Sequence, residues 1–271
     1  MDKIKYAGID LHQATCVIAV HDRDGKTLAQ SIVQTRVEML RGFFSGLGGT
    51  IHVAFEVGTQ SAWLYEILRP VVTSVTVCDV RGKKQRGNKN DRIDAHKLAN
   101  WLRTGDLKAV YQGNQSIRKL RDLAHGYLAA VSDAIRVMNR IKALYRSWSI
   151  PNGGRDVYYK RNREKWISKL PIEESRIRAS AYYGQLDLLQ QQRKELRKAF
   201  LKSARQNPAH KILRKIPGFG PIRSALAIAV IGTPQRFRTR RQLWAYSGLA
   251  VVVRSSSDHE IIEGRIMREA S

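Results

Sequence analysis

Short apolar runs fill the first 80 residues of the chain, whereas apolar residues recur every three or four positions through most of the remainder. The runs predict strands over 3–12, 15–21, 27–33, 51–55 and 74–78. A tight turn at 22–25 joins the second run to the third, and helical spacing fills 36–47 and 61–68. This order indicates an α/β domain in which an antiparallel meander extends into a mixed sheet with helices packed on it.

A third helix is predicted after the segment 86–90, a basic loop that contains a glycine. Two aspartates, Asp91 and Asp94, open this helix, and their spacing of three places both carboxylates on one side. An N-cap with solvated charge explains the same pair, because acidic residues are favoured at helix starts. The apolar stripe of the helix is predicted to consist of Ile93, Ala95, Leu98, Ala99 and Leu102.

Two long helices are predicted in the second half of the chain. Apolar residues recur along one face of 116–148, arginines line the opposite face, and a stretch with Pro and Gly at 150–154 ends the run. A second helix over 173–205 is rich in Leu, Gln and Arg. The pair fits a coiled-coil hairpin or a contact between subunits; alternatively, the charges only keep a helical bundle soluble.

The segment 213–227 looks like a helix-hairpin-helix. Gly218 and Gly220 let the turn pass close to a phosphate, and the next helix presents its N-terminal N–H groups. An ordinary turn between two helices is the alternative. The chain is therefore predicted to have three parts: an α/β domain over 1–112, a basic helical region over 113–206 and a mainly helical domain over 207–271.

Charge narrows the class of partner. The chain has 48 Lys and Arg against 23 Asp and Glu, a net charge of +25, and residues 118–215 hold 24 of the basic and 8 of the acidic residues. Such an excess predicts a polyanionic partner. Basic residues spread along helices favour nucleic acid over a membrane surface, and no stretch approaches the roughly 20 apolar residues of a membrane span. We expect no membrane partner.

Nucleic-acid contacts are predicted at the loop before the third helix, on the first long helix and around the glycine turn. The candidate residues are Lys89, Arg92, Arg136, Arg140, Gly218, Gly220, Arg238, Arg240 and Arg241. The cysteines, Cys16 and Cys78, lack the spacing of a zinc site, which indicates a reduced, cytoplasmic protein.

Two further carboxylates stand where apolar strands end. Asp10 follows Ile9 and has no evident task in a turn, and Glu56 follows Phe55 and precedes the loop 57–59, where the backbone can approach a ligand. Each alone could be a surface charge, but with Asp91 and Asp94 they supply the all-oxygen ligand set that Mg²⁺ prefers. None of His12, His52 and His96 is expected to bind the metal, and all three are expected to pack or to face solvent, although His12 is near enough to Asp10 to support that carboxylate. The sequence therefore predicts a Mg²⁺ site for phosphodiester chemistry.

Three segments, Gly8-Ile-Asp10, Phe55-Glu56-Val-Gly-Thr and Lys89-Asn-Asp91-Arg-Ile-Asp94-Ala, resemble the Asp-Glu-Asp-Asp site of transposases of the IS-one-ten group of bacterial insertion sequences. The resemblance extends over most of the chain. It implies that Asp10, Glu56, Asp91 and Asp94 are metal ligands in a RuvC-like (RNase H-like) domain, followed by a transposase domain with a catalytic serine. It also implies recombination guided by a bridge RNA that pairs with donor and target DNA.

The same resemblance implies Ser256 as the serine that attacks DNA, counted from Tyr246-Ser-Gly-Leu. The glycines that usually follow this serine are replaced by Ser257 and Asp258, so the choice among Ser255, Ser256 and Ser257 stays open. The chain also ends at Ser271, earlier than family members usually do.

The sequence thus predicts an RNA-guided DNA transposase or recombinase that uses Mg²⁺ and a serine nucleophile. It would act on donor and target DNA with a guide RNA, as a homodimer or homotetramer at the nucleoid in the cytoplasm. Two other readings remain. One is a truncated nucleic-acid-binding remnant without recombinase activity, and the other is a RuvC-like structure-specific nuclease that needs no serine.

Overall fold

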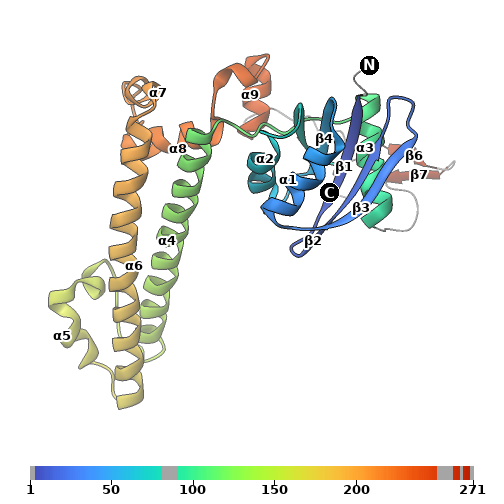
Figure 1. Ribbon diagram of the computed structural model, residues 1–271. Coiled ribbons are helices and arrows are strands. Elements are labelled where there is room, and N and C mark those ends of the chain that lie inside the picture. The colour runs from blue at the N-terminus through green and yellow to red at the C-terminus, as the bar shows by residue number, and fades with distance from the viewer. Residues whose placement is uncertain (1–3, 81–90, 249–258, 263–264, 269–271) are drawn as a thin grey trace. The chain divides into compact units, whose positions relative to one another are not determined.

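The computed structural model describes residues 4–80, 91–248, 259–262 and 265–268. The chain divides into two compact units, Met1–Gln112 and Gly113–Ser271, and each unit has a hydrophobic core of its own. The first unit contains a sheet with helices (Figure 1), and the second is mostly helical.

Five strands of the first unit form one mixed sheet in the order β3-β2-β1-β4-β5. β1 pairs antiparallel with β2, and β2 with β3, whereas β4 runs parallel to both β1 and β5. The predicted meander and mixed sheet are confirmed, and this architecture is consistent with an RNase H-like domain. The strands are β1 Lys5–Leu11, β2 Thr15–His21, β3 Thr27–Gln34, β4 Ile51–Glu56 and β5 Ser74–Cys78.

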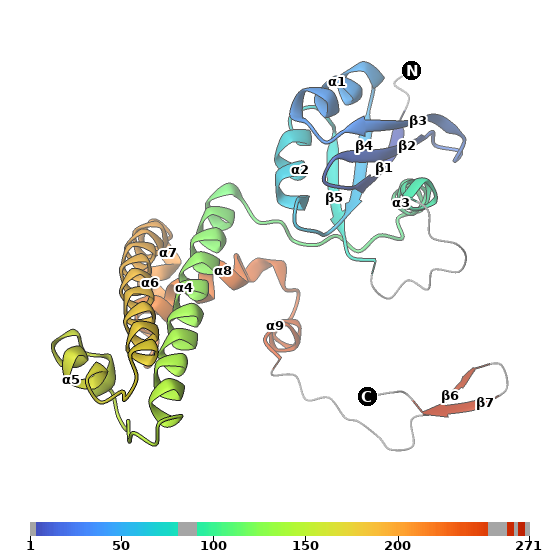
Figure 2. The same cartoon turned by 90° about the horizontal axis from the view of Figure 1, so that it is seen from below.

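Helices cover both faces of this sheet (Figure 2). α1 (Val37–Leu47) and α2 (Ser61–Leu68) lie against one face, where Ala7 and Ile9 of β1 join the main core. α3 (Asp91–Thr104) lies against the other face, where Ala95 packs on β2. Because side chains alternate along a strand, Gly8 and Asp10 of β1 point to the α3 side.

Gly8 allows α3 to approach the sheet closely. A Cβ atom at Gly8 would lie 2.1 Å from the carbonyl oxygen of Ala95 and 2.5 Å from the amide nitrogen of Ala99. Both are backbone atoms, so no side chain can move aside to make room. Only glycine at this position lets α3 pack at the observed depth.

In the second unit, α4 (Gln115–Arg146) and α6 (Glu173–Arg205) pack side by side and run in opposite directions. Ile117 and Leu120 near the start of α4 share a core with Phe200 near the end of α6. Ile141 and Leu144 near the end of α4 share another core with Tyr183 of α6. The predicted pair of long helices is therefore present, as an antiparallel hairpin.

The remaining helices of this unit are short. α8 (Pro221–Ile231) packs on the end of the hairpin, where Arg121 Nε donates to the carbonyl oxygen of Ala229 over 2.7 Å. Gly218, in the turn before α8, has a φ of +82°, a value that favours glycine. The other elements are η1 Asp156–Tyr158, η2 Lys160–Asn162, α5 Arg163–Ile167, α7 Pro208–Leu213, η3 Pro234–Arg236, α9 Arg240–Tyr246, β6 His259–Ile262 and β7 Arg265–Arg268. Within the described residues, every helix is too short or too polar to span a bilayer.

The contact at Gly8 gives a stability prediction. We expect Gly8→Ala to lower the free energy of unfolding by about 3 kcal/mol, because the added methyl group must push α3 off the sheet. Gly42→Ala in α1 is the matched control, since no atom lies within 4 Å of its added Cβ. It should raise the free energy by roughly 0.5–1 kcal/mol through helix propensity. Urea unfolding followed by circular dichroism tests both, and equal effects would contradict the packing argument.

Candidate metal centre

Asp10 and Glu56 lie side by side at one edge of the sheet. Ile9 of β1 is in register with Phe55 of β4, and these strands are parallel. The next residues, Asp10 and Glu56, therefore leave the two strands at the same level and on the same face. Together with the loop 57–60 they line a hollow of about 170 Å³.

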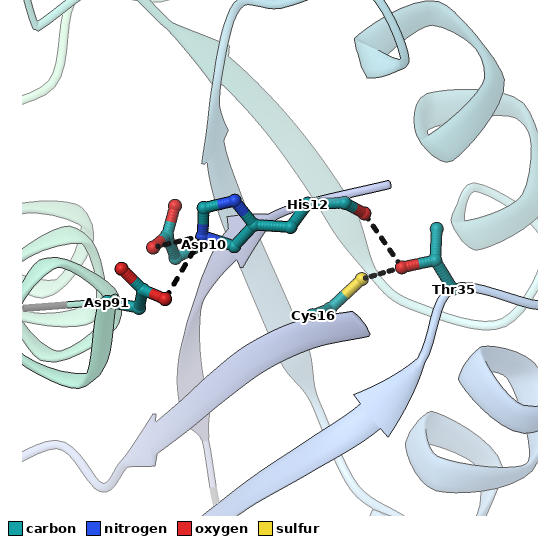
Figure 3. Close-up of polar contacts among 5 residues, drawn as sticks. All are labelled: Asp10, His12, Cys16, Thr35 and Asp91. Carbon is teal, nitrogen blue, oxygen red and sulfur yellow. Dashed lines mark hydrogen bonds and ion pairs between the residues drawn. The ribbon is translucent and has the colours of Figure 1, made fainter. Parts of the chain in front are cut away.

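His12 links the Asp10 side of this edge to the start of α3 (Figure 3). Its Nε2 atom lies 3.1 Å from Oδ2 of Asp10 and 3.4 Å from Oδ2 of Asp91. Asp10 is at the end of a strand, and Asp91 is the first residue of a helix. The packing of α3 on β1 thus brings together two carboxylates that are 81 positions apart in the chain.

The backbone of His12 is held in the short connection between β1 and β2. Its N–H donates to the carbonyl oxygen of Thr15 over 3.1 Å, and its carbonyl oxygen accepts from Oγ1 of Thr35 over 2.9 Å. The same Thr35 hydroxyl lies 3.2 Å from Sγ of Cys16 (Figure 3). These bonds fix the start of the His12 side chain independently of the carboxylates.

Burial and neighbouring carboxylates both disfavour the charged form of Asp10. Burial raises the pKa of the Asp10 carboxyl above its ordinary range, the charges of Asp91 and Asp94 add to this rise, and His12 opposes it. The Asp10 side chain is 25 % exposed, whereas Asp91 is 61 % exposed. Partial burial of one carboxylate near two others favours a bound cation, because a cation would remove the repulsion.

Asp94 and Glu56 do not belong to the close group of ligand atoms from Asp10, His12 and Asp91. Asp94 is half-buried, and its Oδ1 atom accepts from Lys97 Nζ over 3.4 Å. Glu56 is exposed at the rim of the hollow that it shares with Asp10. Both carboxylates are on the α3 side of the sheet edge, but Asp10, His12 and Asp91 alone among the described residues offer three ligand atoms within 4.8 Å of one another.

His96 and His52 pack against neighbouring elements, as expected. Nδ1 of His96 lies 2.8 Å from Nε2 of His21, and Nδ1 of His52 lies 2.7 Å from Oγ of Ser74. His21 is buried, and burial lowers its pKa. These pairs join α3 to β2 and β4 to β5, and neither pair lies with the carboxylates of the metal group.

Comparison with known proteins identifies the family. Residues 7–148 match a family of transposases with a DEDD motif of the IS110 type, and residues 210–271 match the family described as Transposase IS116/IS110/IS902. The chain belongs to the IS110 transposase family. No curated protein matches it. Membership makes the chain a DNA-cutting and rejoining enzyme of an insertion sequence, and it sets Asp10, His12 and Asp91 in the domain of the DEDD match.

Several predicted site residues of the transposase lie outside the described residues. These are Lys89 and the three serines Ser255, Ser256 and Ser257. The described candidates for nucleic-acid contact are exposed, although Arg136 also pairs with Asp133 at 2.9 Å. The exposed candidates are Arg92, Arg136, Arg140, Gly218, Gly220, Arg238, Arg240 and Arg241.

A basic hollow beside α7 was missed by the sequence analysis. It has a volume of about 420 Å³, and its lining is entirely basic: Arg205, His210, Lys211, Arg214 and Lys215. His210 is buried and its Nε2 lies 3.1 Å from the carbonyl oxygen of Pro221. The run Lys211, Arg214 and Lys215 was visible in the sequence, but its meeting with Arg205 depends on the bend between α6 and α7.

The raised pKa of Asp10 predicts a pH-dependent stability in the absence of divalent ions. The folded protein binds the Asp10 proton more tightly than the unfolded chain does, so ionised Asp10 destabilises the fold at pH 7. We expect Asp10→Asn to raise the melting temperature at pH 7. The gain should vanish below about pH 3.9, where the carboxyl is protonated in both states. Differential scanning calorimetry in the presence of a chelator measures the melting temperature of each variant. Asp122→Asn, at an exposed position in α4, is the control. A rise in melting temperature that does not depend on pH would contradict the prediction.

Proposed function

We propose that this transposase is an RNA-guided recombinase that exchanges DNA strands with a divalent metal ion and a serine nucleophile. The convergence of Asp10 and Asp91 on His12, in a chain of the IS110 family, carries the proposal. Glu56 and Asp94 complete the acidic set around the same sheet edge. Donor and target DNA are the substrates, and a guide RNA selects their sequences.

The acidic residues fit a divalent metal ion by the chemistry of their donor atoms. Carboxylate oxygens from Asp10, Glu56, Asp91 and Asp94 are the ligands of hard cations such as Mg²⁺. When bound, such an ion polarises a phosphodiester and lowers the pKa of an oxygen nucleophile. The chain's own task is to hold these carboxylates at the same edge of the sheet: the register of β1 and β4 positions Asp10 beside Glu56, and the packing of α3 positions Asp91.

Ser256 is the proposed nucleophile. Its Oγ atom forms a bond to phosphorus and gives up its proton, while the bond from phosphorus to one sugar oxygen breaks and that oxygen takes up a proton. Attack by a sugar hydroxyl of another strand on this serine phosphodiester joins the new strands and restores the serine. Because two bonds are exchanged without hydrolysis, no external energy source is needed.

Basic surfaces of the second unit supply contacts to nucleic acid. Arg140 lies on the exposed side of α4, and the basic hollow beside α7 offers several cations to one phosphate. The turn before α8, which contains Gly218 and Gly220, is part of a helix-hairpin-helix that binds DNA without regard to sequence. The hairpin of α4 and α6 supports a coiled-coil contact in a homodimer or homotetramer, which would let two DNAs meet in one assembly.

The decisive experiment identifies the guide. The full-length protein is purified from its host, the bound RNA is sequenced, and two DNAs complementary to that RNA are supplied with Mg²⁺. We expect RNA-dependent joining of the two DNAs and a covalent adduct between protein and DNA. Cleavage without an adduct would indicate a RuvC-like nuclease instead. Nucleic-acid binding without cleavage would indicate a remnant that only binds.

Variants at the proposed catalytic residues give a sharp outcome. Asp10→Asn and Ser256→Ala should each lower joining at least about a thousandfold while RNA still co-purifies, because the RNA contacts are attributed to basic residues. Ser247→Ala at the end of α9 is the control and should retain joining. Ser255→Ala and Ser257→Ala test the neighbouring hydroxyls, and loss of the adduct in either variant but not in Ser256→Ala would move the nucleophile.

The basic hollow gives a separate prediction on binding. If Lys211 contacts phosphate, Lys211→Ala should lower affinity for nucleic acids of any sequence. The slope of log K against log salt should become shallower by about one, the effect of one lost phosphate contact. Lys26→Ala, exposed in the turn between β2 and β3, removes the same charge outside the hollow. Filter binding between 50 and 300 mM salt, roughly the range in which such slopes are resolved, measures both; equal slopes in all three proteins would exclude the contact.

A further inference from the structure

The histidine of the β1–β2 connection has no part in an all-carboxylate metal site, yet its ring nitrogen lies among the carboxylates. His12 Nε2 approaches Asp10 Oδ2 and Asp91 Oδ2 at 3.1 Å and 3.4 Å (Figure 3). Adjacent ligands of an octahedral ion with bonds near 2.1 Å are separated by about 3.0 Å. The distance from His12 Nε2 to each carboxylate oxygen is therefore close to that between adjacent ligands of one ion, and all three ligand atoms lie within 4.8 Å of one another.

A hydrogen bond alone explains this arrangement less well. One N–H group points in a single direction, so it cannot donate well to two carboxylates from different elements at once. The ring position is also not a result of those carboxylates alone, since Thr15 and Thr35 hold the His12 backbone. The connection between the strands thus presents the nitrogen to the point where the end of β1 and the start of α3 meet.

We propose that His12 is a direct metal ligand, which makes the centre a mixed nitrogen and oxygen site. The inference rests on the proposed metal centre and adds a fifth residue to it. Imidazole nitrogen binds divalent transition-metal ions better than it binds Mg²⁺. The centre consequently takes an ion such as Mn²⁺ in preference to Mg²⁺, and metal binding ties the β1–β2 connection to β1 and α3.

Mn²⁺ alone, added to the full-length protein, tests the ligand directly. Pulsed electron paramagnetic resonance detects the ¹⁴N coupling of an imidazole bound to Mn²⁺, a signal that a merely structural histidine does not give. We expect this coupling in the unaltered protein and in His125→Asn, an exposed control in α4. His12→Asn should abolish it. Because the His12 side chain is 51 % exposed, the variant should fold, and circular dichroism checks this.

Affinity supplies a second readout. Titration calorimetry should show that His12→Asn raises the Kd for Mn²⁺ at least about tenfold and the Kd for Mg²⁺ by a smaller factor, because the lost ligand is the nitrogen. Equal changes for the two ions would overturn the preference.

Each remaining outcome overturns a specific claim. Mn²⁺ bound without ¹⁴N coupling removes His12 as a ligand and leaves the carboxylate centre of the proposed function in place. Coupling that persists in His12→Asn assigns the nitrogen to another residue, which also removes His12. If Mn²⁺ binds no better to the unaltered protein than to Asp10→Asn, both this inference and the proposed metal centre fail.

Discussion

The site depends on how closely α3 can approach β1. Gly8 removes the one Cβ atom that would collide with the backbone of α3, and the small residues Ala95 and Ala99 face it. This packing sets how close α3 lies to the sheet and which residues of α3 lie over Gly8. Because Asp91 is the first residue of α3, its distance from Asp10 is set by that contact, although the two residues are not bonded to each other. A backbone contact in the core thus determines the geometry of an exposed cluster.

Such a cluster conflicts with the stability of the protein that carries it. Desolvation and the charges of Asp91 and Asp94 disfavour ionised Asp10, and His12 offsets only part of this cost. Next to the cluster, hydrogen bonds hold both the N–H and the carbonyl group of His12. The sheet core, where Ile9 and Phe55 are fully buried, offsets the cost of a repulsive group of side chains at its edge.

Periodicity predicted most of this fold because each strand and helix has a clear apolar face. The strands at 15–21 and 74–78 and the helices at 61–68 and 173–205 have the predicted bounds. Ile93 was predicted to belong to the apolar stripe of α3, but it is 42 % exposed and lies outside the packed face. Close packing against Gly8 selects the narrow face with Ala95 and Ala99, and a hydrophobic pattern alone cannot weigh small residues against large ones.

The candidate site was predictable only in part, for a similar physical reason. Asp10 and Glu56 stood out because a strand end is an unusual place for a carboxylate, whereas the approach of His12 to Asp91 follows from tertiary packing.

The two units differ in the charge that they would present to DNA. The acidic cluster repels DNA unless a cation neutralises it, whereas the basic residues of 118–215, whose net charge is +16 (24 − 8), attract a polyanion. Binding and chemistry are therefore separable, and weakening either by mutation should leave the other measurable.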